Sequence, residues 1–217
     1  MKKAIIFDLD GTLLNTLPTI TYYVNATLKA FDVGVLGEAD VCRYIGHGAE
    51  WLIEKSLLHF GIEDKDLFRK VLAHYKNAYD EAPLYLTEVY EGMYALLEGL
   101  KERGVKLAVF SNKPDFATKA VVSHFFGDTF AHVQGAKPDV ALKPAPDGVF
   151  DIAKTLGVEK SECLFVGDTI VDMETGENAG VDTVGVLWGF RDREELERGR
   201  AGYIVSTPNE ILAIREL

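Results

Sequence analysis

The sequence has few basic residues, few cysteines and no long apolar run. Its 217 residues include 34 acidic against 23 basic side chains, which gives a formal charge of −11. Because nucleic-acid affinity comes mainly from Lys and Arg, this balance argues against nucleic acid, and likewise against anionic membranes, as partners. The two cysteines, Cys42 and Cys163, lie far apart and lack zinc-site spacing. We interpret them as small buried side chains in a reducing cytoplasm.

No apolar run approaches the roughly 20 residues that a membrane-spanning helix needs. The apolar stretch after the initial Met1-Lys2-Lys3 ends at Asp8, which is too short for the core of a signal peptide. Hydrophobic residues still make up 47% of the chain, enough to bury a core. We therefore expect a soluble cytoplasmic protein, and its oligomeric state stays open because an exposed apolar patch is not visible in a sequence.

Four short, continuous apolar runs are typical of central strands that are buried on both faces. They cover residues 3–7, 106–111, 162–167 and 181–187. Helix-like stretches lie among them, at 92–103, 115–125, 146–156 and 172–179. This alternation predicts an α/β fold with a Rossmann-like parallel sheet and helices on both sides. In such sheets, ligands bind at the carboxyl ends of the strands.

Residues 17–82 interrupt this alternation. Apolar residues recur at helical spacing over 17–31 and 68–79, and residues 49–60 form a third helix-like stretch. We predict an all-helical cap domain at 17–82, inserted into a catalytic core formed by residues 1–16 and 83–217. A helical unit that is joined by two neighbouring linkers can move as a lid.

Two acidic pairs follow predicted strands. Asp8 and Asp10 come after the first strand, and Asp168 and Asp172 follow the strand at 162–167. Residues two apart in an extended chain point the same way, so Asp8 and Asp10 can face one site. Converging carboxylates repel one another unless a cation lies among them, and oxygen ligands favour Mg²⁺. Each pair alone is also explained by turn or cap chemistry, with Asp172 capping the helix that follows it.

Two further polar positions lie at equivalent places in the predicted sheet. Ser111 and Asn112 close the strand at 106–111, and Lys143 lies in the loop after the next strand-like stretch. Taken singly, the Ser-Asn pair is explained as a turn and the lysine as a surface residue. Their combination with the two acidic pairs favours a single site at the carboxyl edge of the sheet.

In order and spacing, these motifs resemble those of the phosphatases of the haloacid dehalogenase superfamily. The DxDGT motif of that family matches Asp8 to Thr12, and its Ser or Thr after the second core strand matches Ser111. Its lysine matches Lys143, and its GDxxxD motif matches residues 167–172. The resemblance extends over essentially the whole chain and implies that family's fold, a Rossmann-like core with an inserted cap.

The resemblance also implies Mg²⁺-dependent hydrolysis of a phosphomonoester through an aspartyl-phosphate. It assigns Asp8 as nucleophile and metal ligand. Asp10 becomes the general acid and base and binds the metal through its backbone carbonyl. A halide leaving group needs no proton, so an acid at Asp10 favours phosphate esters over haloacids. The resemblance gives the other residues three kinds of role: Asp168 binds the metal, Ser111, Asn112 and Lys143 bind phosphoryl oxygens, and Thr12 and Asp172 support the site.

Within the predicted cap domain, residues 42–48 are the most suggestive of substrate recognition. Gly46 and Gly48 flank His47 and allow a tight turn, while Arg43 can pair with a substrate carboxylate. The alternative is a helix-to-helix turn with a surface arginine. The segment resembles the lid loop of the phosphoglycolate phosphatases, a subfamily that often has Asn at the position of His47.

The stretch Ser111-Asn-Lys-Pro114 also resembles the second motif of that subfamily. Its Lys113 either recognises a second anionic group or caps the loop. We therefore expect a small phosphorylated metabolite, first of all 2-phosphoglycolate, as substrate. A sugar-phosphate phosphatase, a pyrophosphatase, a β-phosphoglucomutase-like phosphotransferase and a catalytically silent phosphate-binding module remain alternatives.

Overall fold

The computed structural model describes residues 1–138 and 140–215, and the chain divides into two compact units. One unit combines Met1–Asn15 with Val89–Leu217, and the other is Thr16–Glu88. The second unit therefore begins one residue before the predicted cap domain and ends six residues after it. None of the helices in the described ranges has an apolar stretch long enough to cross a membrane.

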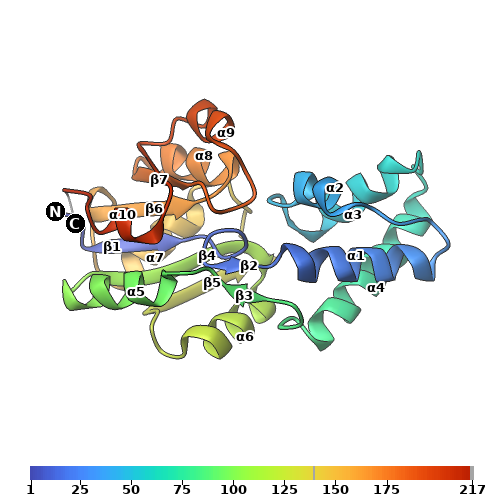
Figure 1. Ribbon diagram of the computed structural model, residues 1–217, viewed down its shortest axis with the longest axis horizontal. Helices are drawn as coiled ribbons and strands as arrows, with labels where there is room; N and C mark the ends of the chain where they lie inside the picture. Colours follow the sequence, from blue (N-terminus) through green and yellow to red (C-terminus); the bar gives the residue numbers. More distant parts are fainter. Residues whose placement is uncertain (139, 216–217) are drawn as a thin grey trace. The chain divides into compact units, whose positions relative to one another are not determined.

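A parallel sheet forms the centre of the first unit. In the described residues its strands follow the order β5-β4-β1-β6-β7-β8 (Figure 1). All four apolar runs that predicted central strands are strands of this sheet, and β1 lies between β4 and β6. The strands are β1 (Ala4–Phe7), β4 (Lys106–Pro114), β5 (His132–Ala136), β6 (Cys163–Gly167), β7 (Asp182–Val186) and β8 (Tyr203–Val205).

Helices pack against both faces of this sheet, as the alternating pattern predicts. On one face Ile6 and Phe165 belong to the same buried cluster as Ile152 of α7. On the other face Phe7 makes an edge contact with Phe130, which in turn contacts Phe126 of α6. The helices of this unit are α5 (Met93–Glu102), α6 (Asp115–Phe126), α7 (Asp147–Leu156), α8 (Ile170–Ala179), α9 (Arg193–Arg198) and α10 (Pro208–Ile211), with a short 3-10 helix η1 (Lys160–Glu162).

The second unit is helical. Its elements are α1 (Leu17–Ala30), α2 (Glu38–Tyr44), α3 (Gly48–His59) and α4 (Lys65–Glu81), and Figure 1 shows them in blue to green. Helix α1 packs on α2 and α4, and α3 packs on α4. Val24, Ile53 and Val71 are fully buried in this unit, in agreement with the helical spacing of its apolar residues. Two short strands, β2 (Leu14–Asn15) and β3 (Glu88–Val89), pair with each other.

The structure also extends the predicted secondary structure. Helix α2 reaches Tyr44, so Arg43 lies in the last helical turn of α2. The connection between α2 and α3 is therefore shorter than residues 42–48. At this connection, Gly46 and Gly48 both have positive φ angles, 121° and 84°. A positive φ strains other residues, which explains the two glycines.

Candidate active site

Parallel pairing brings three of the predicted residues to the same edge of the sheet. Strand β1 pairs with β4 on one side and with β6 on the other. Asp8 directly follows β1, Ser111 lies in the last half of β4, and Asp168 directly follows β6. The backbone N–H of Asp8 still donates to the carbonyl of Val166 at 2.8 Å, so the sheet fixes the position of Asp8.

Three buried carboxylates form the centre of this edge. Among the described residues, oxygen atoms of Asp8, Asp168 and Asp172 lie within 4.8 Å of one another. The ammonium group of Lys143 donates to Asp8 Oδ1 at 2.7 Å and to Asp172 Oδ1 at 2.6 Å. The Lys143 side chain is only 3% exposed. A single ammonium group thus faces three carboxylates, which leaves the cluster with surplus negative charge when all are ionised.

This crowding of charge shifts the pKa values of the cluster. Burial raises the pKa of Asp8 to about 7, with Lys143 opposing the rise and Asp172 adding to it. Burial, and then the charges of Asp172 and Asp8, also raise the pKa of Asp168 well above its ordinary value. Burial alone lowers the pKa of Lys143, but the two carboxylates that it contacts outweigh this effect and raise it. Without a metal, the cluster therefore resists full ionisation.

Asp168 is held by two loops. Thr12 Oγ1 donates to Asp168 Oδ1 at 3.0 Å, and the backbone N–H of Phe190 donates to Oδ2 at 2.8 Å. A Cβ atom on Gly11 would lie 2.3 Å from Asp168 Oδ2, so only glycine fits there. The indole of Trp188 donates to the carbonyl of Thr12 at 2.9 Å. From the sequence, Trp188 either lines the rim of the site or packs at a strand end, and Phe190 is not a candidate, because the contacts of both residues depend on the course of the loop after β7.

Asp172 has both of the roles that the sequence left open. Its Oδ2 accepts from the backbone N–H of Thr169 at 3.0 Å and from Thr169 Oγ1 at 2.8 Å, a capping box that begins α8. Its Oδ1 accepts from Lys143. Asp172 therefore caps α8 with one oxygen atom and orients Lys143 with the other.

Asn112 fixes the backbone of Lys143. Its Nδ2 donates to the Lys143 carbonyl at 3.0 Å, and its Oδ1 accepts from the Lys143 N–H at 2.8 Å. Asn112 is predicted to bind phosphoryl oxygens through its backbone N–H, and this use of its side chain is not visible in the sequence. Ser111 lies beside it and is buried, and its Oγ accepts from the backbone N–H of Lys113 at 3.2 Å.

Asp10 lies outside the cluster of three. Its two carboxylate oxygens lie 3.1 and 3.4 Å from Lys113 Nζ. The sequence argument considered Lys113 only as a ligand for a second anionic group or as a loop cap, and it did not predict this ion pair. The spacing Ser111-Asn-Lys113 was visible, but the direction of the lysine side chain was not.

The cluster suits a small divalent cation with oxygen ligands. Asp8 and Asp168 supply buried carboxylates at the end of the sheet, and burial, followed by the charges of neighbouring carboxylates, raises the pKa of each. Mg²⁺ typically takes one or two carboxylates and keeps water or phosphate in its other positions. The residues present therefore fit Mg²⁺ at Asp8 and Asp168.

We expect Mg²⁺ to stabilise the fold more at pH 8 than at pH 5.5. In metal-free protein the pKa of Asp8 rises from 3.8 to about 7 on folding. The stability that belongs to the protonated carboxyl is present below the unfolded pKa and is lost as pH rises through about 7. Mg²⁺ binds the ionised form, so saturating Mg²⁺ should raise Tm by about 5–10 °C at pH 8 and by clearly less at pH 5.5.

Thermal unfolding in Mg²⁺ and in EDTA at the two pH values measures this difference. The matched control is Asp168→Asn, which should lose most of the Mg²⁺-dependent rise in Tm. An equal rise at both pH values would contradict the assignment of the metal to these carboxylates.

The remaining predicted site residues belong to the helical unit. Arg43 lies at the end of α2 and pairs with Asp40 of the same helix. Gly46 lies in the turn that follows, and the backbone of His47 caps α3. The His47 ring lies 5.0 Å from the ring of Trp51, measured between centroids. Arg43 and His47 are exposed, which is compatible with contacts to a ligand.

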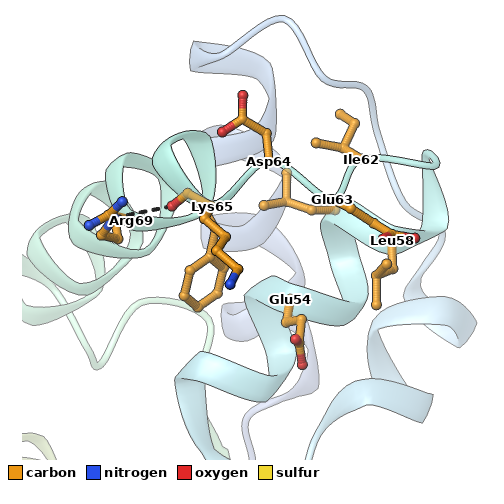
Figure 2. Close-up of a pocket in the computed structure, with 9 residues that line it drawn as sticks. Glu54, Leu58, Ile62, Glu63, Asp64, Lys65 and Arg69 are labelled. Carbon is orange, nitrogen blue, oxygen red and sulfur yellow. Dashed lines mark hydrogen bonds between the residues drawn. The ribbon is translucent and has the colours of Figure 1, made fainter.

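A separate hollow of about 710 Å³ lies inside the helical unit, between the end of α3 and the start of α4 (Figure 2). Its apolar lining comes from Leu57, Leu58, Ile62 and Phe68. None of the predicted site residues lines this hollow. The candidate metal cluster found in the described residues, Asp8, Asp168 and Asp172, also lies outside it. We therefore place the chemistry at the sheet edge and not in this hollow.

The chain is similar to known proteins over most of its length. The family profile of the haloacid dehalogenase-like hydrolases matches residues 5–186. A phosphoglycolate phosphatase from Rhodospirillum rubrum is 36% identical over 196 residues, covering 88% of this chain and 81% of that protein. A phosphoglycolate phosphatase from Aquifex aeolicus is 33% identical and covers 99% of this chain and 97% of its own length.

Solved structures agree with the fold. The crystal structure of a predicted phosphoglycolate phosphatase from Haemophilus somnus superposes with a TM-score of 0.90 at 28% identity. The superposition covers 98% of this chain and 97% of the other. A hydrolase from Pseudomonas syringae gives a TM-score of 0.79 at 26% identity, over 98% and 97% of the two chains.

Proposed function

Because the chain belongs to the haloacid dehalogenase-like hydrolases, we propose that it is a Mg²⁺-dependent phosphatase that hydrolyses a small phosphate monoester. The observation that carries the proposal is the placement of Asp8. This carboxylate lies at the end of a central strand, it is bound by a buried ammonium group, and a second buried carboxylate lies beside it. Such a carboxylate is positioned to attack phosphorus and to be restrained while it does so.

The reaction proceeds in two displacements. Asp8 attacks the phosphorus, the ester P–O bond breaks, and the leaving alkoxide takes a proton from the Asp10 carboxylic acid. Asp10 then accepts a proton from water as the water oxygen attacks the phosphorus of the aspartyl-phosphate. The bond to Asp8 breaks, phosphate leaves, and Asp10 holds the proton for the next cycle. Atoms and charges balance with ester and water as the only reactants.

Two side chains bind the transferred phosphoryl group. Lys143 has three N–H donors, and two of them point at Asp8 and Asp172. We assign the third donor to a phosphoryl oxygen. Ser111 lies at the same sheet edge and supplies a hydroxyl donor. Asn112 contributes indirectly, since its side chain holds the Lys143 backbone in place.

Asp8 and Asp168 would hold Mg²⁺ with their side chains, and Asp10 with its backbone carbonyl. When bound, Mg²⁺ supplies positive charge that offsets the negative charge of the carboxylates and of the phosphate. Thr12 and the Phe190 N–H keep Asp168 in place for this purpose. The hydrogen bonds that surround Asp168 thereby fix the metal relative to the nucleophile.

We propose residues 17–82 as a cap that selects the substrate, and 2-phosphoglycolate as that substrate. The names of the relatives support this choice, as does the resemblance of residues 42–48 to a lid loop. The cap residues that we assign to the substrate are Arg43, Gly46 and His47. Phosphoglycolate carries a carboxylate besides its phosphate, and an arginine pairs well with a carboxylate.

We expect kcat/KM for 2-phosphoglycolate to exceed that for other phosphorylated metabolites by at least about tenfold. The panel contains 2-phosphoglycolate, glucose 1- and 6-phosphate, pyrophosphate and a nucleoside monophosphate, and phosphate release is measured for each. Activity should fall by at least about 100-fold in EDTA and should return with Mg²⁺. Arg43→Gln should lower the preference for phosphoglycolate and leave hydrolysis of p-nitrophenyl phosphate largely unchanged.

The other outcomes of this panel identify the alternatives. A preference for a sugar phosphate or for pyrophosphate would contradict the assignment of 2-phosphoglycolate as substrate but would agree with the proposed hydrolysis. Conversion of glucose 1-phosphate to glucose 6-phosphate without phosphate release would indicate a phosphotransferase. If no ester releases phosphate, p-nitrophenyl phosphate included, the result would favour a catalytically silent phosphate-binding module.

A further inference from the structure

Lys113 forms a nearly buried ion pair with Asp10. Its side chain is 5% exposed and that of Asp10 is 14% exposed. Its Nζ lies within 3.4 Å of both carboxylate oxygens of Asp10. A lysine is rarely buried unless its charge is paired, because removing an ammonium group from water is unfavourable. The site thus contains a second buried ammonium group besides Lys143, and it is directed at a different carboxylate.

The backbone of Lys113 is fixed from two sides. Its N–H donates to Ser111 Oγ at 3.2 Å, and its carbonyl accepts from Thr118 Oγ1 at 3.1 Å. A Cβ atom on Gly135 would lie 2.6 Å from the same carbonyl, so strand β5 closes the remaining side. A lysine on an anchored backbone holds its partner at a defined position, whereas a surface lysine does not.

The two lysines contact different carboxylates of the site. Lys143 holds Asp8 and Asp172, while Lys113 holds Asp10. The oxygens of Asp10 are not part of the group of three that could surround a metal. The Asp10 carboxylate is therefore held by Lys113 and lies outside that group, although only one residue separates Asp10 from Asp8.

We propose that Lys113 is a positioning residue for the second half of the reaction, in which water hydrolyses the aspartyl-phosphate. The inference rests on the proposed function. Lys113 orients the Asp10 carboxylate so that it accepts a proton from the attacking water. The new P–O bond forms to the water oxygen, the bond from phosphorus to Asp8 breaks, and the proton of the water passes to Asp10. Lys113 itself touches neither water nor phosphate in this role.

The test separates the two half-reactions with p-nitrophenyl phosphate, whose leaving group departs without a proton from Asp10. Lys113→Met should lower kcat by about 10- to 100-fold and change KM much less, since misplacement of a catalytic group by about 1 Å costs rate on this scale. Hydrolysis of the phosphoenzyme then limits the rate. Stopped-flow mixing should accordingly show a burst of p-nitrophenol that approaches one equivalent per site.

Three further variants make the result specific. Lys119→Met removes a lysine from α6 that is 54% exposed and pairs with Asp115, and it should behave as wild type. Lys113→Arg should recover part of kcat and reduce the burst. Lys113→Gln, which keeps a donor without the charge, serves as the second test if Lys113→Met folds poorly by circular dichroism.

A double-mutant cycle tests whether Lys113 acts through Asp10. If it does, the double variant Lys113→Met with Asp10→Asn should be no slower than Asp10→Asn alone. Additive losses, a rise in KM at unchanged kcat, or a fall in kcat without a burst would each overturn the inference. Unchanged activity of Asp8→Asn would instead overturn the proposed function, so the two failures are distinguishable.

Discussion

Replacing Asp8 with Asn is expected to lower kcat by at least about 10⁴-fold on every phosphate ester, including p-nitrophenyl phosphate. An amide oxygen is a far weaker nucleophile than a carboxylate, so no aspartyl-phosphate forms. Asn has nearly the same volume as Asp, and its amide oxygen can still accept from Lys143, which lies 2.7 Å from Asp8 Oδ1. The loss should therefore come from the missing nucleophile and not from a collapsed site.

Stability separates these two explanations. Burial raises the pKa of Asp8 to about 7, which means that its ionised form is unfavourable in the metal-free fold. The Asp8→Asn substitution removes that unfavourable charge, so Tm of the variant in EDTA at pH 8 should equal or exceed that of wild type. Asp182→Asn is the matched control, because that carboxylate is 61% exposed and pairs with Lys2 at 2.6 Å. Turnover by Asp8→Asn at the wild-type rate would contradict the assignment of Asp8 as the nucleophile.

The sequence predicts the centre of the sheet better than its edges. Strands β1 and β6 are fully buried, and a strand that is buried on both faces has the continuous apolar run that reveals it. Strand β5 has the sequence HVQGA and β8 has only three residues, and both lie at the edges of the sheet. Edge strands are short and less apolar, so the same criterion does not delimit them.

Placement of the carboxylates was predictable for a related reason. Parallel strands have their carboxyl ends at one edge of the sheet, so the residues that follow the central strands lie close together there, whatever the orientation of their side chains. The partner of each lysine was not predictable in this way. Lys113 lies near the end of β4 and Lys143 in the loop after the neighbouring strand β5, and only the directions of the side chains decide that one contacts Asp10 and the other Asp8. Such directions depend on packing among residues distant in sequence, which a motif does not contain.

Replacing Lys143 with Met is expected to destabilise the protein by about 3–5 kcal/mol at pH 8 in EDTA. Met fills most of the same volume but leaves the carboxylates of Asp8 and Asp172 buried without their ammonium group, which lies 2.7 and 2.6 Å from them. The variant should also lose about 10²- to 10³-fold in kcat, since a donor to the phosphoryl group disappears together with the restraint on the nucleophile.

The pH dependence identifies the cause of this destabilisation. In wild type, the two carboxylates raise the pKa of Lys143, so its ammonium group stays charged from pH 5.5 to 8. In the variant, the pKa of Asp8 rises further above about 7 because the opposing charge is gone. Asp8 is then protonated at pH 5.5, and the free energy of unfolding should differ less from wild type there than at pH 8.

Chemical denaturation at the two pH values measures both differences, and Lys119→Met again provides the exposed control. A loss of stability that is the same at pH 5.5 and pH 8 would contradict the electrostatic explanation and would favour lost packing of the lysine stem. Mg²⁺ supplies an alternative positive charge near Asp8, so it should restore part of the stability of the variant but little of its kcat. Stability needs only a cation close to the carboxylates, whereas catalysis also needs the donor that Lys143 holds toward the phosphoryl group.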